Sequence, residues 1–498
     1  MECKKVANYR PITLSAIAVS IGIVLAGLTV KVGIAYFLLL AILAVAVVVV
    51  TILKRKALIL IALFTTLGFL SFSITYFVRS EDAVYYDSAY LEGRVEQISS
   101  KAEERKRYVL EDIKLNGVEV GGKAQLTIND DLEVGDVVGA LVYGSTNEYN
   151  PFDTYVALQY GKNIRHVFNA TYAEKLYSTE LDLIEKIRVK ITDMLFEYVG
   201  EEEGAVALGL VLGDTAYVNR FAKEDMRVSG LAHLFAVSGL HIGFMCGLVY
   251  GLFRLIKVSK RKSLILVIAV LLFYGIITAF PAGVVRATIM ALCLLFSEII
   301  EERYDALNTL SLAVILMLLF NPSELFNISF LMSVGAVFGI ACFYRPLSNL
   351  CTCENKIVKK GWDLISVSVA ANLYIFAISA YAFGTVSIYF VLSNLVAVPV
   401  AGVIYSVLVS VVLVTLIIPT LGILLVPLKY PIGILTAFSG LIASLPSASV
   451  EITIPIVAGI TYAIALTFIS KFNLIRNKIK IIVFCSLLVL TALIIIIF

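Results

Sequence analysis

The sequence predicts a polytopic α-helical membrane protein of about thirteen spans that carries one small all-β domain outside the cytoplasm. Hydrophobic residues make up 60% of the 498 residues and charged residues only 15%. The mean hydropathy is +0.93. A soluble domain has about 25% charged residues, so this composition excludes an ordinary soluble protein. Apolar runs of about 20 residues, enough to cross a bilayer as a helix, recur along most of the chain.

The first third of the chain contains three apolar segments followed by a long polar stretch. The three segments lie at about 12–30, 32–53 and 57–78. Lys4, Lys5 and Arg10 before the first one resemble the start of a signal peptide. That segment is too long for a signal peptide and leads directly into a second span, which favours a retained signal anchor. A polar region follows from about 80 to 180.

The remainder of the chain is predicted to be almost entirely membrane-spanning. Its apolar segments lie at about 231–253, 263–280, 282–300, 304–320, 325–344, 362–384, 386–417, 429–447, 453–470 and 480–498. Segment 386–417 is too long for one straight helix, and we expect Pro399 to break it. The predicted organisation is therefore residues 1–79 as N-terminal spans, 80–175 as the outer domain, 176–230 as an amphipathic helix with a short re-entrant or surface segment, and 231–498 as the polytopic domain.

Clusters of basic residues in short loops predict the orientation. They are Lys54 to Lys56, Arg254 to Lys262, Lys356 to Lys360, and Lys471 to Lys480. If the N-terminus is cytoplasmic, all four clusters fall on the cytoplasmic side, as the positive-inside rule requires. This places residues 80–180 outside the cytoplasm.

The outer polar region is predicted to form a small β-barrel. Short runs of strand character alternate with turn signals between residues 91 and 143, and Asn116-Gly117 is a strong hairpin signal. About five short strands in this length suit a small barrel, of which the OB-fold is one option. Residues 180–202 repeat apolar residues at helical spacing with charges between, which predicts an amphipathic helix on the membrane surface or on the barrel.

The first candidate site is the stretch from His233 to His241, which contains two of the three histidines of the chain. The third, His166, lies in the outer domain. Polar groups inside a bilayer are costly unless they are paired or wet, so they are functional candidates. On an ideal helix, Ser238 and His241 share a face. The alternative is that these groups only hydrogen-bond neighbouring helices and hold the bundle together.

The second candidate site is Arg286, which follows Pro281 at the start of an apolar segment. An arginine inside a span costs about 2.5–3.5 kcal/mol even on the insertion scale that assigns the lowest penalty, so it must pair or face water. It could line a pathway for an anionic substrate, or it could form a structural ion pair with Glu298 or Asp214. Asp214 ends a short apolar run, 204–212, and could also be only a turn residue.

The sequence predicts no enzymatic chemistry. It has no Walker A motif for nucleotide hydrolysis, and three histidines cannot supply a histidine-rich two-metal nuclease site. Ser238 and His241 as nucleophile and base would lack an orienting acid nearby. The seven cysteines show no zinc or disulfide spacing, and Cys351 and Cys353 are interpreted as two loop thiols. We therefore expect a channel or transporter without metal or cofactor.

A basic cluster in the outer domain is a candidate contact for nucleic acid. It consists of Lys101, Arg105, Lys106 and Arg107, next to Tyr108. Residues 80–170 nevertheless contain nine Lys or Arg against sixteen Asp or Glu, the wrong balance for phosphate binding. The cluster could equally be a solvated hairpin. If the barrel touches DNA, we expect it to use this patch together with stacking aromatics such as Tyr108 or Tyr143.

Several motifs together resemble the ComEC family of competence proteins, over about residues 80–450. The matching segments are His233 to His241 with Asp214 and Gly243, Asn150 to Asp153 with Tyr155 and Gly161, Gly204 to Asp214, Pro281 to Met290, Asp305 to Asn308, Asn321-Pro322, Phe383-Gly384, and Asn394 to Pro399. The resemblance implies an outer OB-fold domain and passage of single-stranded DNA through a bacterial plasma membrane during natural transformation. His233, Ser238, His241, Arg286 and Asp214 are then the candidates for lining the DNA pathway.

The sequence also departs from the family pattern. Many members end in a metallo-β-lactamase-like domain, which we expect this chain to lack because it stops after its last apolar segment. Ser329 to Val334 stand where the family usually has G-F-Q-L-S-F and lack the glutamine of that motif, and Asn372 and Ala377 replace a common glutamine and proline. The implied partners are single-stranded DNA, the lipid bilayer, an external DNA receptor and a cytoplasmic helicase or motor; a separate nuclease and a homodimer remain open. The alternative is a relative that transports another solute or acts as a membrane assembly scaffold.

Overall fold

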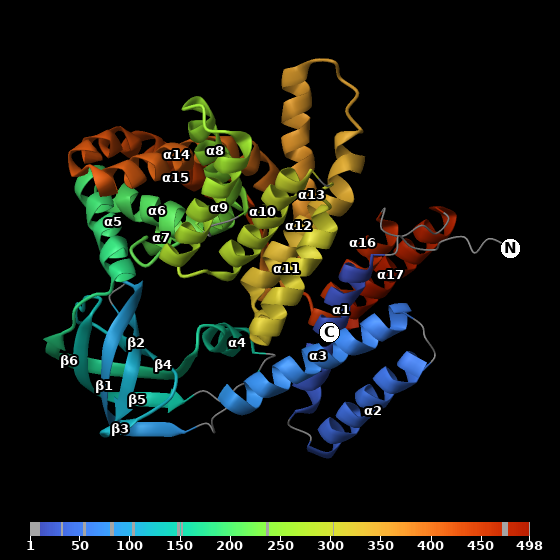
Figure 1. Ribbon diagram of the computed structural model, residues 1–498, viewed down its shortest axis with the longest axis horizontal. Helices are drawn as coiled ribbons and strands as arrows, with labels where there is room; N and C mark the ends of the chain where they lie inside the picture. The colour runs from blue at the N-terminus through green and yellow to red at the C-terminus, as the bar shows by residue number, and fades with distance from the viewer. Residues whose placement is uncertain are drawn as a thin grey trace.

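The computed structural model describes residues 10–30, 33–52, 56–79, 84–101, 105–146, 150, 153–235, 239–301, 303–470 and 477–497. One β-barrel lies beside a large helical body (Figure 1). Within the described residues, 8 helices are long and apolar enough to cross a membrane, and four shorter apolar helices accompany them. Every apolar segment predicted from the sequence contains a helix. The chain is a polytopic membrane protein.

The N-terminal helices pack through glycine. They are α1 (Pro11–Thr29), α2 (Gly33–Ile52) and α3 (Lys56–Arg79). A Cβ on Gly22 would lie 2.0 Å from the carbonyl oxygen of Thr65, and one on Gly68 would lie 2.2 Å from that of Val19. The backbones of α1 and α3 therefore touch, which only small residues permit at a membrane helix crossing.

The outer domain is a closed barrel. Its strands are β1 (Tyr85–Ser100), β2 (Lys106–Leu115), β3 (Val118–Glu119), β4 (Lys123–Ile128), β5 (Asp136–Thr146) and β6 (Ile164–Ser178). The pairing runs β1-β2-β4-β6-β5 and back to β1, and only β4 and β6 are parallel. Asn116 and Gly117 form the turn between β2 and β3 with φ of 51° and 82°, so the predicted hairpin is confirmed. The helix α4 (Thr154–Gly161) precedes β6.

Three helices connect the barrel to the membrane bundle: α5 (Leu183–Val199), α6 (Glu201–Leu212) and α7 (Arg220–Val228). A capping box between Asp182 and Glu185 starts α5. As predicted, α5 is amphipathic, but the face that was expected on the membrane surface or the barrel packs into the core of the bundle. The whole run 204–212 in α6 is buried inside the main hydrophobic core. Arg94 of β1 fixes the barrel to α5 through two hydrogen bonds with Glu185, 2.6 and 2.8 Å long.

The polytopic domain contains the remaining elements. They are η1 (Ala232–Leu234), α8 (Gly239–Leu255), α9 (Lys260–Ile277), α10 (Ala282–Ile300), α11 (Ala306–Phe320), η2 (Pro322–Phe326), α12 (Ile328–Ser348), α13 (Lys356–Phe383), β7 (Thr385–Ser387), α14 (Phe390–Ile417), η3 (Pro419–Leu428), α15 (Lys429–Ala443), β8 (Ser449–Glu451), α16 (Ile456–Ile469) and α17 (Asn477–Ile497).

Two features of this domain differ from the sequence prediction. The expected break at Pro399 is wrong, because α14 continues through that residue. A proline removes one backbone hydrogen bond, and packing against neighbouring helices makes this loss tolerable in membrane helices. The two three-residue strands β7 and β8, which pair with each other, had no signal in the sequence because each is too short to show a pattern.

Candidate functional site

Arg286 lies in the first turns of α10, just after a tight reversal of the chain. Ala279 and Phe280 both have positive φ, 58° and 47°, and Pro281 then caps the helix. The reversal places Arg286 deep in the bundle, where the residue is 4% exposed. Its Nη1 donates to the carbonyl oxygen of Ser333 in α12, while its Nε has no hydrogen-bond partner. The first turns of α10 therefore hold the guanidinium of Arg286 against a neutral carbonyl of α12.

Neither of the carboxylates proposed as structural partners pairs with Arg286. Glu298 pairs with Lys260, with 2.9 Å between Nζ and Oε2. Asp214 lies 4.0 Å from Nη2 of Arg188. Among the residues that the structure describes, no carboxylate forms an ion pair with Arg286. A buried cation without a counter-charge is costly, so this position suits an anion that arrives from elsewhere.

His241 lies in the first turn of α8 and is 1% exposed. Its ring packs against the ring of Tyr405 in α14, with the centroids 4.5 Å apart. Two residues before it, a Cβ on Gly239 would lie 3.8 Å from Cβ of Ala287, the residue that follows Arg286. The start of α8 therefore packs beside the start of α10, and the histidine and the arginine occupy neighbouring helices.

His233, the other described candidate of this motif, does not join Arg286 and His241. His233 lies in η1, where it is exposed, and its Nδ1 is 3.2 Å from the carbonyl oxygen of Gly230. The two histidines of the motif are thus separated into a surface position and a core position. Ser238, the third member, lies outside the described residues.

Asp214 occupies a turn at the end of α6, after Gly213 in the left-handed conformation. Its Oδ1 accepts a hydrogen bond of 2.9 Å from the amide of Ala216. Burial raises the pKa of Asp214 above its usual value, although the Ala216 amide and Arg188 partly oppose the effect. The structure brings Asp214 to the junction between the barrel and the bundle, because its contacts are with Arg188 of α5 and with Ala216, which belongs to the barrel core.

The basic patch on the barrel is partly neutralised. Asp131 accepts from Lys106 at 2.6 Å and lies 3.8 Å from Lys101, and this contact with Lys106 lowers the pKa of Asp131. Arg107 is half-buried, and Arg105 is exposed.

Tyr108 does not belong to the surface of that patch. The residue is fully buried in the barrel core. Its hydroxyl donates to the carbonyl of Asp130 at 3.0 Å and accepts from the amide of Leu132 at 3.1 Å. The ring therefore packs inside the barrel and offers no face to a base, whereas Tyr143 is 43% exposed.

Sequence reasoning missed the residues that surround the candidates. Ser333 and Tyr405 belong to helices far away in sequence, and only the packing of the bundle brings them to Arg286 and His241. Tyr274 in α9, whose hydroxyl donates to the carbonyl of Val211 at 2.6 Å, was also missed. The only sequence feature that could have indicated Tyr274 is a hydroxyl group inside an apolar run.

The fold and this site define a polytopic membrane protein with an attached β-barrel and a buried cation that forms no ion pair with any described residue. The family model described as "Competence protein" matches residues 210–476, more than half of the chain. The chain belongs to this family, the ComEC family of competence proteins.

Individual relatives support the same assignment. The chain is 26% identical to ComE operon protein 3 of Bacillus subtilis over 253 residues, which cover 51% of this chain and 31% of that protein. It is 28% identical to Recombination protein 2 of Haemophilus influenzae over 239 residues, which cover 43% and 30%. The matches thus span less than a third of the length of these relatives. No solved structure matches the chain.

Proposed function

We propose that this protein is a channel, without enzymatic activity of its own, that carries single-stranded DNA across the cytoplasmic membrane during natural transformation. The observation that carries the proposal is the buried guanidinium of Arg286, whose partner is a neutral carbonyl and which meets no carboxylate in the part of the chain that the structure describes. Residue 286 also lies inside the segment that matches the competence family.

The chemistry of Arg286 suits a phosphodiester that passes through the bundle. A hydrogen bond from a cation to an anion is roughly twice as strong as one to a neutral acceptor. A phosphate can therefore replace the carbonyl of Ser333 as the hydrogen-bond acceptor of Arg286. After the phosphate has left, the carbonyl can accept the hydrogen bond again. His241, packed beside the same helix, would shape this part of the path. Moderate binding that repeats along the strand is what conduction requires.

The outer domain and the orientation complete the proposal. We infer that the barrel is an OB-fold, since five strands close in a Greek-key order with one parallel pair. The basic loop clusters support a position of the barrel outside the plasma membrane. Because its surface charge is acidic, contact with DNA would be limited to exposed groups such as Arg105 and Tyr143. Energy would come from a cytoplasmic helicase or motor, and DNA from an external receptor.

The direct test is uptake of labelled DNA into the cytoplasm of the native host after deletion of the gene. Complementation with wild type should restore entry. Arg286→Gln and His241→Ala should fail to do so while still reaching the membrane. Arg261→Gln, which changes an exposed arginine in α9, is the matched control and should behave as wild type. Unchanged entry after deletion would rule out the channel in that host.

A second function is favoured by the separation of the two histidines. His233 is exposed while His241 is buried, so the two histidines do not share one environment. This arrangement fits a relative that transports a smaller solute, or a membrane assembly scaffold. In that case Arg286→Gln would leave DNA entry intact, and the scaffold would be recognised by the loss of partner proteins from the membrane on deletion.

A further inference from the structure

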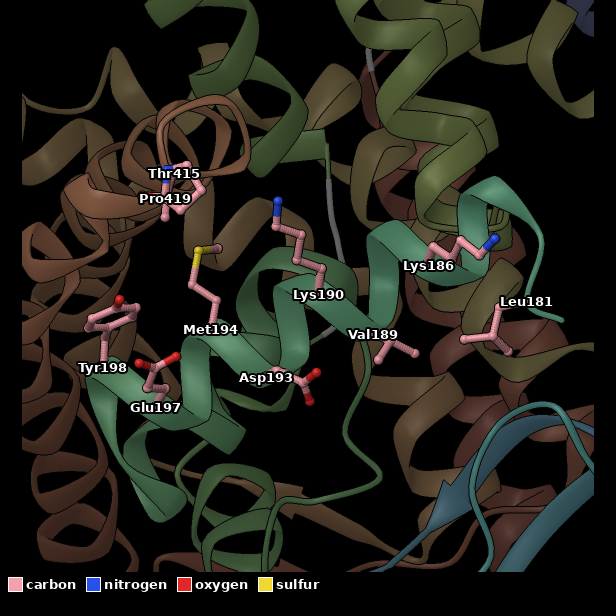
Figure 2. A pocket seen from close by; sticks show the side chains of 10 residues that line it. All are labelled: Leu181, Lys186, Val189, Lys190, Asp193, Met194, Glu197, Tyr198, Thr415 and Pro419. Atoms are coloured by element: carbon pink, nitrogen blue, oxygen red, sulfur yellow. The ribbon is translucent and has the colours of Figure 1, made fainter. Parts of the chain in front are cut away.

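A cavity of 320 Å³ lies between the amphipathic helix α5 and the turn that joins α14 to η3. Figure 2 shows Lys190 and Glu197 along α5, with Thr415 and Pro419 facing them from the other side. The cavity is remote from Arg286 in sequence and in its lining. It has no part in the function proposed above.

Thr415 carries the first sign that this cavity binds a ligand. The residue is 3% exposed, and its hydroxyl has no hydrogen-bond partner. Ser406 and Ser410 in the same helix behave differently, because each donates to the carbonyl four residues back, at 2.8 and 2.6 Å. A buried hydroxyl that leaves this local bond unmade needs another partner, since nearly all buried polar groups have one.

The charges around the cavity are the second sign. Lys186 and Lys190 lie one turn apart on α5, and Asp193 and Glu197 follow one turn apart on the same helix. None of these four side chains forms an ion pair with any residue in the described ranges. The lining therefore offers a positive end and a negative end, with no net charge.

The position of the cavity identifies the kind of molecule that reaches it. Thr415 and Pro419 lie where the candidate span Phe390–Ile417 ends and the next one, Pro419–Ala443, begins. Two consecutive spans meet at a membrane surface, which would put the cavity at the depth of lipid headgroups. Ile417 beside the cavity is 81% exposed, as is typical of a side chain covered by lipid tails.

We propose that this cavity binds the headgroup of a zwitterionic aminophospholipid, phosphatidylethanolamine. Lys190 reaches the end of α14, where its Nζ lies 3.4 Å from the carbonyl oxygen of Leu416. The phosphate therefore binds between Lys190 and the hydroxyl of Thr415, and the ammonium donates to Glu197 and Asp193. An anionic headgroup would leave these two carboxylates without a partner, and a choline headgroup has no N–H to donate.

Native mass spectrometry of the detergent-solubilised protein tests the proposal. The protein is offered phosphatidylethanolamine, phosphatidylglycerol and phosphatidylcholine with identical tails. We expect phosphatidylethanolamine to be retained preferentially, and Thr415→Val or Lys190→Met to weaken its retention about tenfold, the effect of losing one charge-assisted hydrogen bond. Thr436→Val, whose hydroxyl bonds within its own helix, and Lys262→Met on an exposed turn are the matched controls.

A gain of binding separates the proposal from simple misfolding. Glu197→Gln removes a negative charge and should shift the preference from phosphatidylethanolamine towards phosphatidylglycerol, which an unfolded variant cannot imitate. Three results would overturn the assignment: wild-type protein that prefers phosphatidylglycerol, cavity variants that bind lipid as the controls do, or soluble phosphoethanolamine that competes as well as the intact lipid.

Discussion

At the scale of single residues, the candidates are distinguished by what surrounds each of them. Arg286 is a buried cation against a neutral carbonyl, His241 is packed on an aromatic ring, and His233 is exposed. Asp214 is a half-buried turn residue at the junction with the barrel. Only the first of these has a charge that the described residues leave unmatched.

Arg286→Met tests whether that unmatched charge serves function at the expense of stability. Methionine has similar length and needs no counter-charge, so the unfolding temperature of the variant should equal that of wild type or exceed it. The free energy of unfolding should rise by up to about 1–3 kcal/mol. Arg94→Met breaks the contacts with Glu111 and Glu185 and should lower the unfolding temperature. Thermal unfolding in detergent measures both, and a large loss of stability in Arg286→Met would make this arginine structural.

Asp214→Asn should remove a pH dependence. Burial raises the folded-state pKa of Asp214, so the folded state binds its proton more tightly than the unfolded state does. Stability from this group is therefore present at low pH and falls as the pH rises from the unfolded pKa of about 3.9 through the folded value. Asparagine can still accept from Ala216 and carries no charge. The stability of the variant relative to wild type should increase from pH 4 to pH 8, and a constant difference would contradict the burial argument.

At the scale of elements, the closest helix contact is the crossing of α1 and α3. Because Gly22 and Gly68 leave no room for a Cβ, either Gly22→Leu or Gly68→Leu should force the two helices apart. Overpacking of this kind costs typically 1–3 kcal/mol and more where backbone must move. Gly247→Leu in α8 is the control, because nothing lies within 4 Å of its Cβ position. Thermal unfolding measures the effect: the unfolding temperatures of Gly22→Leu and Gly68→Leu should fall below that of Gly247→Leu. Equal unfolding temperatures for the three variants would exclude a close crossing.

At the scale of the whole molecule, the orientation proposed from the charges in the loops can be tested directly. Cys353 is exposed in the loop between α12 and α13, and the proposed orientation, which rests on the basic residues from Lys356 onwards, puts this loop in the cytoplasm. In a variant that keeps only this cysteine, an impermeant maleimide should react after permeabilisation and not before. Arg105→Cys in a cysteine-free chain should react in intact cells, because the proposed orientation puts the barrel outside the cytoplasm. The reverse pattern would invert the topology.

Much of the fold was predictable because its signals are local. Apolar run length predicted the helices, and Asn116-Gly117 predicted a turn that forms as expected. The site was less predictable. That Arg286 is buried follows from the sequence, but its partner Ser333 depends on how α10 packs against α12. Tyr108 was placed on the surface by its neighbours Lys106 and Arg107, although strand alternation turns its ring inwards.

The closure of the barrel restricts how this protein can be joined by others. The pairing of β6 with β4 ends at Asn169, so residues 170–178 of β6 pair with β5 alone. Residues 85–90 of β1 likewise pair with β5 alone. In the described barrel, these two stretches and the two-residue strand β3 leave backbone groups unpaired at a sheet edge. A receptor or a second copy of the chain that joins by adding a strand is therefore directed to these stretches, and recognition of the remaining barrel surface depends on side chains in its loops and faces.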